Sequence, residues 1–583
     1  MHGVKKSSPA SEAQLAELKR ERKEKLQKFI YGKNLVFTKR GNKEFDDELL
    51  EVTGELVKKQ PNMYTVWNIR REVLEEKANK KEESEDEYTA RLAEMYDGEL
   101  KLSMQALLSD PKSYSAWYHR DFVLSKHPKP DFKRELEICE KALEFDCRNF
   151  HCWDHRRFTA QLAKLDESEE LEFSDRLVSK NPSNYSAWHY RGTLLPKIAP
   201  NSNGNPICIN DERLQQEFDK VKVPTCYNTE DQTAWTYCRW LSEVSCVGPV
   251  EPTLIVSVTF VALNQALIVF NNSVDKEFVN RTVKADTYTP ISVVNLPKND
   301  KYIKTKLWMV RRDAGFDFPV AFGVELEDDR VESVEKEGYC NKRYLKNHFA
   351  IKNLCVTETS TNILTELVEM CRELMKDDDK NPWEPLALAR TLLLLKRSDK
   401  DNLAEVDAML QKAIELDPQR RNVYQNIIDI VRITENLCHP MENLDKVISR
   451  DENEVNLSQR NIRSVSHLHY LAGHINSLVL QYNRIEDTKQ FNSFPLLIHL
   501  TLDDNPVTKV HSDLRLPCLE FLSLARCQIQ SSDALKCLPN VAPNLKRLLI
   551  CETQLAKDEE QLKLLKDSFE QQQYHVTVIV HYL

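Results

Sequence analysis

The sequence has few of the residues that nucleotide-binding enzymes use to cradle a phosphate. Only 12 of its 583 residues are glycine, and neither a Gly-x-Gly-x-x-Gly run nor a phosphate-binding loop pattern occurs. Its 15 cysteines are scattered and include no Cys-x-x-Cys pair, which argues against a disulfide framework or a zinc knuckle. A self-contained cofactor enzyme is therefore not expected.

The sequence also lacks an excess of positive charge and long apolar runs. Its formal net charge is -10, whereas nucleic acid and anionic lipid call for a basic field. No stretch reaches the roughly 18 apolar residues of a membrane span, and the N-terminus has no apolar signal core. These absences predict a cytoplasmic protein that neither binds nucleic acid nor inserts into membranes.

What the sequence does contain is a repeat built on an aromatic residue, a tryptophan three positions later and an arginine three positions beyond that. The fifth copy departs from the pattern, with Gln232 in place of the aromatic, Cys238 at the expected arginine position and the arginine shifted by one. A frayed sixth copy is placed at Trp383. The five copies carry Trp67 and Arg70, Trp117 and Arg120, Trp153 and Arg156, Trp188 and Arg191, and Trp235 and Arg239.

The spacing of these copies predicts helical hairpins. Successive tryptophans lie 50, 36, 35 and 47 residues apart, and Leu-rich amphipathic stretches precede the motifs. Residues three and four apart share a helix face, so each motif can dock against the preceding hairpin and the hairpins stack as a solenoid. The recurrent arginines could face a partner, but an arginine in every unit suits a structural task, such as pairing with carboxylates of the adjacent hairpin.

Two other sequence patterns interrupt or follow the predicted helices. Short β-branched runs predict an inserted Ig-like β-sandwich, and a later repeat with steps of 23, 22, 22 and 26 residues is typical of leucine-rich repeats. The fold class is therefore multidomain and mainly α. The predicted domains are 1–247, the first part of the solenoid with a flexible N-terminal tail, 248–358, the β-sandwich, 359–447, the continued solenoid, and 448–583, the leucine-rich repeats.

The Trp-x-x-Arg copies resemble the protein prenyltransferase α-subunit repeat. The order of helical repeats, β insertion, further helices and leucine-rich repeats resembles the α subunits of the Rab (type II) geranylgeranyltransferases over nearly the whole chain. The resemblance implies a heterodimer, because in that family the α solenoid curls around a β subunit that holds a zinc ion and the isoprenoid pocket. The resemblance also implies that this chain is not active without its β subunit.

The implied reaction transfers a geranylgeranyl group from geranylgeranyl diphosphate to C-terminal cysteines of Rab GTPases, which an escort protein presents. The resemblance assigns Lys112, two residues before the aromatic of the second copy, to the leaving diphosphate, with Tyr114 lining the same rim. A solvated lysine at a helix start is the alternative for Lys112. The resemblance also suggests His2, on the charged tail, as a contact to the partner's zinc ion, and it leaves the involvement of magnesium open.

The histidines near the repeat tryptophans could have either a functional or a structural role. His119 and His189 could face a partner or pack against the next hairpin. His151 and His155 are four apart, a metal-compatible spacing, but they lack the glutamate of a His-Glu-x-x-His motif, which favours a structural role.

Two alternative functions remain at the level of sequence. One is a non-enzymatic adaptor, because both repeat types are commonly protein-binding surfaces. The other is the α subunit of a farnesyl or type I enzyme, which carries only the helical repeats. Binding of one stoichiometric β subunit and a Rab substrate presented by an escort protein would distinguish the type II reading from both.

Overall fold

The computed structural model divides into two compact units, residues 1–198 and 199–583. Each unit is considered by itself. The structure describes residues 12–80, 83–201, 208–245, 255–262, 265–275, 277–279, 283–284, 291–296, 304–312, 321–325, 331–335, 343–345, 357–377, 380–395, 400–438, 454–465, 468–469, 472–473 and 475–581. None of its described helices is both long and apolar enough to cross a membrane.

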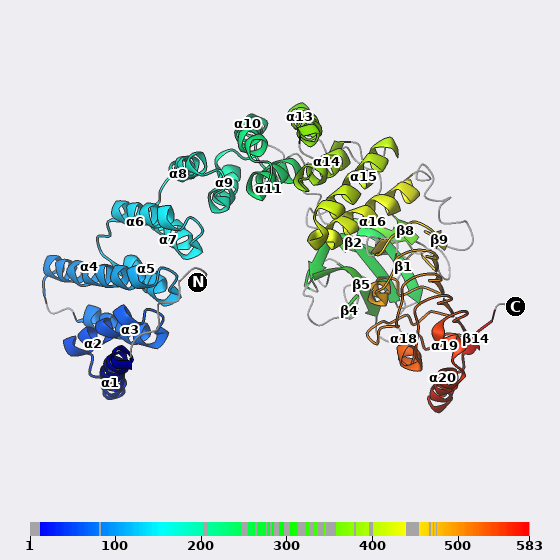
Figure 1. The fold of residues 1–583 in the computed structure, drawn as a ribbon, viewed down its shortest axis with the longest axis horizontal. Coiled ribbons are helices and arrows are strands. Elements are labelled where there is room, and N and C mark those ends of the chain that lie inside the picture. The colour runs from blue at the N-terminus through cyan, green and yellow to red at the C-terminus, as the bar shows by residue number, and fades with distance from the viewer. Residues whose placement is uncertain are drawn as a thin grey trace. The chain divides into compact units, whose positions relative to one another are not determined.

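The first unit consists of helices packed as successive antiparallel pairs (Figure 1). Most second helices begin at the aromatic residue of a sequence copy, one position after a polar capping residue such as Ser113 or Asn149 whose side chain accepts a backbone N–H. The helices are α1 (Glu12–Asn42), α2 (Asp47–Lys59), α3 (Tyr64–Asn79), α4 (Glu85–Ser109), α5 (Tyr114–Lys126), α6 (Phe132–Phe145), α7 (Phe150–Ala163), α8 (Glu167–Lys180) and α9 (Tyr185–Ile198).

The repeat tryptophans close the turn inside each hairpin. Every one of the five is buried, and its indole N–H donates to the carbonyl oxygen six residues earlier at 2.8 or 2.9 Å. Two of those carbonyls also bind the next hairpin, because Pro61 O accepts from the Ser113 hydroxyl and Pro111 O from the Asn149 amide. One carbonyl thus joins two copies, which explains why the motif recurs with its capping residue.

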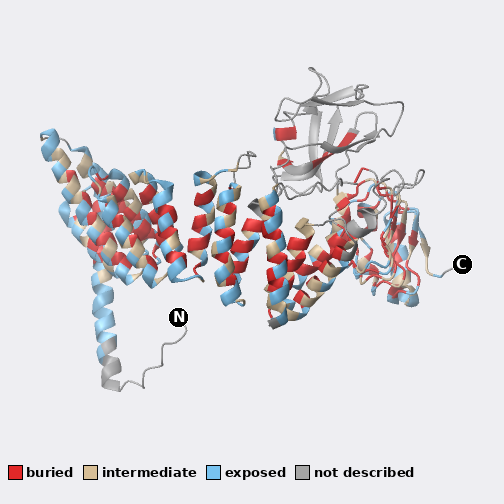
Figure 2. Ribbon diagram, turned by 90° about the horizontal axis from the view of Figure 1, so that it is seen from above, coloured by how far each residue is buried: buried red, intermediate tan, exposed pale blue. Residues whose placement is uncertain are grey.

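Buried ion pairs link one hairpin to the next. Arg70 donates to both carboxylate oxygens of Glu99, Arg120 to those of Glu135, and Arg156 to those of Glu170. These side chains are at most 9% exposed. Each bidentate ion pair therefore lies in the core, where Figure 2 shows buried residues between the helices. Arg191 pairs with Asp175 at 2.8 Å.

A third residue completes each buried group. It lies two positions after a tryptophan, and its ring nitrogen or hydroxyl contacts the same glutamate at 2.8 to 3.2 Å. The pairs are His119 with Glu99, His155 with Glu135, Tyr190 with Glu170 and, in the second unit, Tyr237 with Glu217. His119 is fully buried, so it does not face a partner, and it packs on Trp67 of the preceding hairpin rather than on the next one.

The second unit begins with more helices of the same kind. In the fifth copy Cys238 takes the buried position of the arginine and lies 3.6 Å from the Thr225 hydroxyl. Arg239 is correspondingly 58% exposed and pairs with Glu243 of its own segment. The helices are α10 (Asp211–Tyr227), α11 (Gln232–Trp240), the π-helical turn η1 (Leu241–Ser245), α13 (Glu358–Asp377), α14 (Trp383–Leu395), α15 (Lys400–Leu416), the 3-10 turn η2 (Pro418–Arg420) and α16 (Arg421–Cys438).

The sixth copy is not centred on Trp383. Asn381 caps α14 and donates to Thr229 O, the carbonyl that also accepts the Trp235 indole. Counting from that capping residue places Pro385 where the other copies have tryptophan and Leu388 where they have arginine. The capping contact sets the register, and Trp383 lies two residues too early.

Eight described strands lie between α11 and α13 in the sequence. β4, β5, β2, β1 and β8 form one antiparallel sheet in that order, and β3, β6 and β7 form a second. β2 supplies a run of fully buried side chains from Ala266 to Phe270. The strands are β1 (Ile255–Ala262), β2 (Gln265–Asp275), β3 (Val283–Lys284), β4 (Ile291–Leu296), β5 (Lys304–Arg312), β6 (Ala321–Glu325), β7 (Val331–Glu335) and β8 (Arg343–Leu345).

The C-terminal part of the second unit is a parallel sheet of six short strands in sequence order. Leu478, Leu500, Leu522 and Leu548 pair in register and are buried. The buried amide of Asn505 donates to Leu480 O and Leu502 O and accepts from Ile485 N–H, so it joins neighbouring turns. The strands are β9 (Glu454–Asn456), β10 (Ser477–Val479), β11 (His499–Thr501), β12 (Phe521–Ser523), β13 (Arg547–Leu549) and β14 (Thr577–Ile579).

Short helical segments connect these strands, and α16 covers the open end of the sheet's core. The buried carboxylate of Asp429 accepts from the backbone N–H groups of Arg463 and Ser464, while Arg432 bridges Asp407 and Asn461 O. The helix therefore satisfies backbone donors at the first turn of the array. The connecting segments are η5 (Thr488–Ser493), η6 (Ser532–Ala534), α18 (Leu538–Val541), α19 (Gln554–Lys557) and α20 (Glu559–Gln571).

Candidate functional site

The turn that carries Lys112 is held on both sides. Asp110 ends α4 and its carboxylate accepts the Lys112 backbone N–H at 3.1 Å. Pro111 O accepts the Trp117 indole N–H at 2.8 Å, and Ser113 caps α5. The sequence Asp-Pro-Lys-Ser thus forms a rigid turn that projects the residue at position 112 outward.

Lys112 itself is a solvent-facing cation. Its side chain is 68% exposed, and its ammonium nitrogen lies 3.2 Å from the carboxylate of Asp146 at the end of α6. A pair this exposed contributes little to stability. The ammonium can therefore exchange Asp146 for a stronger anion at small cost.

Tyr114 lies on the same edge of the unit, at the start of α5. Its ring is 68% exposed and packs edge-on against His151 at a centroid distance of 4.1 Å, with Phe150 at 6.0 Å. His151 is 7% exposed. Burial, together with the nearby Lys112 charge and despite nearby Asp154 and Asp110, lowers its pKa, so the ring is neutral at pH 7. A neutral, buried His151 fixes the Tyr114 ring without adding charge.

The sequence predicts a structural role or a metal-ligand role for His151 and does not indicate its contact with Tyr114. The two rings come from different copies, 37 positions apart. The available signal was weak: an aromatic at each helix start followed, in the third copy alone, by histidine. Its metal-compatible neighbour His155 points elsewhere, into the Asp121 and Glu135 carboxylates.

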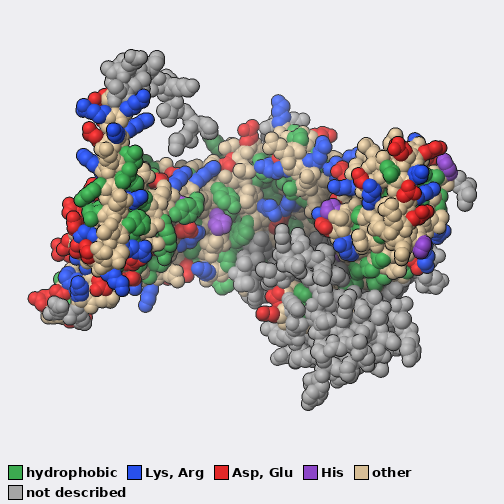
Figure 3. Space-filling model, turned by 90° about the horizontal axis from the view of Figure 1, so that it is seen from below, with side chains coloured by type: hydrophobic (Ala, Val, Ile, Leu, Met, Phe, Trp, Pro, Cys, Tyr) green, Lys and Arg blue, Asp and Glu red, His purple; other side chains and the backbone are tan. Residues whose placement is uncertain are grey.

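Other helix starts in the first unit also expose aromatic rings. Tyr64 is 60%, Phe150 52% and Tyr185 47% exposed, and Tyr118 on α5 is 58% exposed. Figure 3 shows hydrophobic side chains interspersed with charged ones on one face of the molecule. Exposed aromatics repeated at equivalent positions are characteristic of a protein-binding surface.

Comparison with known proteins identifies the family. The protein prenyltransferase α-subunit repeat matches residues 96–127, 132–163 and 167–198. The geranylgeranyl transferase type-2 subunit alpha of Homo sapiens is 30% identical over 580 residues, which cover 95% of this chain and 92% of that protein. The protein of the same name from Mus musculus is 30% identical over 96% of this chain and 97% of its own length. The chain belongs to the geranylgeranyl transferase type-2 α-subunit family.

More distant relatives match only part of the chain. The type-2 subunit alpha of Saccharomyces cerevisiae is 30% identical over 253 residues, covering 41% of this chain and 72% of its own. A solved structure of Candida albicans protein geranylgeranyltransferase-I complexed with GGPP is 14% identical, with a TM-score of 0.39 over 68% of this chain and 88% of that one. Full-length agreement with the mammalian type-2 α subunits is therefore what defines the family here.

Within the described residues, no group of three or more His, Cys, Asp and Glu side chains could hold a metal ion. His2, which the sequence offered as a contact to a partner's zinc, lies outside the described residues. His189, the remaining histidine with two readings, is exposed and stacks on Tyr185 at 6.1 Å.

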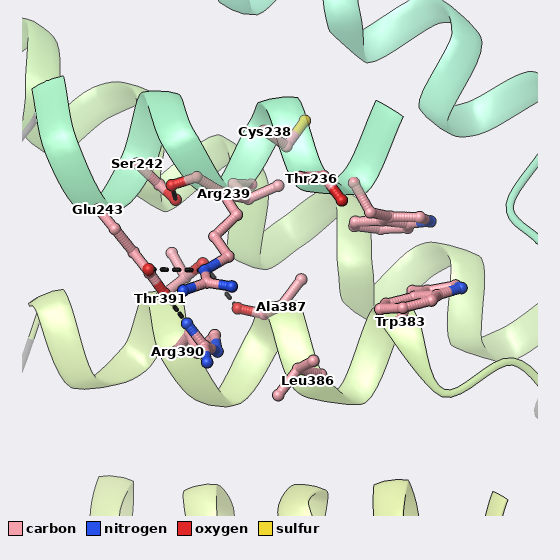
Figure 4. A pocket seen from close by; sticks show the side chains of 12 residues that line it. Thr236, Cys238, Arg239, Ser242, Glu243, Trp383, Leu386, Ala387, Arg390 and Thr391 are labelled. Atoms are coloured by element: carbon pink, nitrogen blue, oxygen red, sulfur yellow. Dashed lines mark hydrogen bonds and ion pairs between the residues drawn. The ribbon is translucent and has the colours of Figure 1, made fainter. Parts of the chain in front are cut away.

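The second unit of this family member contains a cavity of about 70 Å³ between α11, η1 and α14 (Figure 4). Arg239 and Arg390 converge there on the Glu243 carboxylate, and Trp383 and Leu386 form part of the wall.

The buried His155 makes the stability of this α subunit depend on pH. Burial alone would lower its pKa, but hydrogen bonds with Asp121 and Glu135 raise the pKa to about 9 from 6.5. The stabilisation is complete below pH 6.5 and is lost as pH rises toward 9, on the order of 3 kcal/mol in all. Thermal unfolding between pH 6 and 9.5 should show this decline, and a His155→Gln variant should flatten it. Parallel curves for the two proteins would contradict the assignment.

Proposed function

We propose that this chain is the α subunit of a heterodimeric protein geranylgeranyltransferase. The proposal rests on full-length similarity to type-2 α subunits together with a projecting cation on an aromatic-rich surface. Its β subunit holds the catalytic zinc and the isoprenoid pocket, and the α solenoid positions that subunit. The co-substrate is geranylgeranyl diphosphate, and the acceptors are C-terminal cysteines of Rab GTPases presented by an escort protein in the cytoplasm.

The α chain contributes to the chemistry through Lys112. A cysteine thiolate attacks C1 of the isoprenoid, the C1–O bond breaks and the electron pair leaves with the diphosphate. The zinc ion of the partner supplies a stabilised thiolate when it is bound. Negative charge grows on the leaving oxygens, and a fixed ammonium stabilises that charge more in the transition state than in the ground state.

The Lys112 side chain is suited to this task because its present partner is weak. Both Lys112 and Asp146 are substantially exposed, and a diphosphate carries far more charge than one carboxylate. Tyr114, held edge-on by His151, offers a hydroxyl at the same rim. Lys112 therefore acts as the leaving-group cation, and Tyr114 lies beside it. His2 is proposed to contact the zinc ion that the partner subunit holds.

We also propose finer identities for the two added modules. The five-stranded and three-stranded antiparallel sheets between 255 and 345 favour an Ig-like sandwich. The in-register parallel strands with bridging Asn483 and Asn505 favour leucine-rich repeats. Both suit protein recognition rather than chemistry, which agrees with a substrate presented by another protein.

The decisive experiment is co-expression with a prenyltransferase β subunit followed by transfer assays. We expect a 1:1 complex that modifies a Rab GTPase with geranylgeranyl diphosphate and depends on the escort protein. Short peptides ending in cysteine should be poor acceptors. Failure to bind any β subunit would leave only the adaptor reading, and efficient transfer to short peptides without an escort would favour a type I enzyme.

A further inference from the structure

Arg71 differs from the other buried arginines of the first unit. Arg70, Arg120 and Arg156 each meet a glutamate through two nitrogen atoms. Arg71 is equally buried, at 8% exposure, but its Nη2 donates only to the side-chain oxygen of Asn68. Within the described part of the chain, its Nη1 is buried without a hydrogen-bond partner and the guanidinium forms no ion pair with a carboxylate.

The surroundings of Arg71 are aromatic. Its Cζ lies 4.9 Å from the centre of the Tyr118 ring and 5.9 Å from that of Phe122. Burial lowers the pKa of Arg71, against the weaker influence of Tyr118, Tyr64 and Glu75, but an arginine keeps its charge. A buried cation without a carboxylate is costly, and only part of that cost is recovered by the ring face.

The rings near this cation are themselves exposed. Tyr118 is 58% and Tyr64 60% exposed. Tyr64 is the first residue of α3, and Tyr118 lies near the start of α5. We call Tyr64, Arg71 and Tyr118 the Arg71 cluster. The ring of Tyr118, which lies next to the guanidinium, can be reached by an approaching group. Tyrosine and arginine are also the residue types that dominate binding energy at protein interfaces.

We propose that the Arg71 cluster docks the β subunit, and that a carboxylate of that subunit pairs with the Arg71 guanidinium in the complex. This inference rests on the proposed function and names one contact of its interface. It accounts for the missing partner in the isolated chain, because the second half of the ion pair arrives with the other subunit. Flanking rings then exclude water from the pair.

A single carboxylate fits the cluster better than a diphosphate does. A diphosphate carries several negative charges, and its binding sites use several cations. The cluster offers one cation, since the adjacent Arg70 is already neutralised by Glu99. The planar guanidinium also matches the two oxygens of one carboxylate.

The test compares Arg71→Met with Arg157→Met in the full-length chain. Arg157 occupies the same repeat position in the third copy, but it is 42% exposed and pairs with Asp154 within its own helix. Methionine keeps the apolar stem and removes the charge. We expect Arg71→Met to weaken association with the β subunit at least about tenfold, with unchanged or higher thermal stability of the isolated α chain. Arg157→Met should change neither.

Tyr118→Ala provides a second variant, because an exposed side chain can be removed without disturbing the core. It should also weaken association. Wild-type affinity in both Arg71→Met and Tyr118→Ala would overturn the inference, as would a change confined to the KM for geranylgeranyl diphosphate, which would indicate a diphosphate contact. If the wild-type chain does not bind a β subunit at all, that result would instead contradict the proposed function.

Discussion

Replacing Glu135 by alanine should destabilise the α6–α7 region by about 3 to 5 kcal/mol, the cost of leaving buried charges unpaired. Glu135 is 3% exposed and accepts from Arg120 at 2.9 and 2.7 Å and contacts His155 at 3.2 Å. Burial would raise its pKa, but the hydrogen bond with His155 and the Arg120 charge lower it. The carboxylate is therefore ionised and serves two partners at once.

Glu137→Ala is the matched control, because Glu137 lies two residues further along the same helix and is exposed. Urea unfolding of the heterodimer followed by circular dichroism should separate the two variants. Adding Arg120→Met to Glu135→Ala should recover part of the loss, since one unpaired charge is removed. An equal midpoint for Glu135→Ala and Glu137→Ala would show that the buried pair contributes nothing.

The helical repeats could be predicted from the sequence because each copy contains its own fixing contacts. The indole of Trp117 reaches a carbonyl six residues back, so aromatic spacing alone reports the hairpin turn. The pairing of Arg120 with a carboxylate of the adjacent hairpin also follows from repetition. The identity of the carboxylate does not, because Glu99 follows Arg70 by 29 residues while Glu135 follows Arg120 by 15.

The spacing between each glutamate and the histidine or tyrosine that contacts it is constant. Glu99 precedes His119 by 20 residues, Glu135 precedes His155 by 20, and the two tyrosine pairs share this interval. In the second to fifth copies, a search for glutamate 20 residues before the position two after the tryptophan would have found the buried groups. The first copy has Leu49 at that place. The register of the sixth copy could not be found in this way, since the Asn381 contact to Thr229 O that sets it spans 152 residues.

The candidate site was predictable only in part, and for a similar reason. Lys112 and Tyr114 are close in the sequence, so their common edge follows from one rigid turn. The support that His151 gives to Tyr114 depends on how two hairpins stack, and no residue pattern within one copy specifies it. The Arg71 cluster is likewise visible only when Tyr118 of the next hairpin is placed over the guanidinium.

Lys112→Ala should lower kcat for geranylgeranyl transfer by about a hundredfold in the heterodimer, the loss typical of removing one group that stabilises developing negative charge. The KM for the protein substrate should change little, because the contact strengthens only as the diphosphate departs. Lys112→Arg should retain part of the rate, since it keeps the charge with a different geometry. Single-turnover transfer to a Rab GTPase measures the chemical step directly.

Lys180→Ala is the control that separates chemistry from surface electrostatics. Lys180 and Lys112 are both 68% exposed, and Lys180 pairs with Glu144 at 2.9 Å much as Lys112 pairs with Asp146 at 3.2 Å. The two substitutions remove the same charge and a comparable exposed ion pair, so their effects on folding should be small and alike. Only Lys112 lies beside Tyr114 on the turn held by Pro111. Equal kcat values for the two variants would show that position 112 is an ordinary surface lysine.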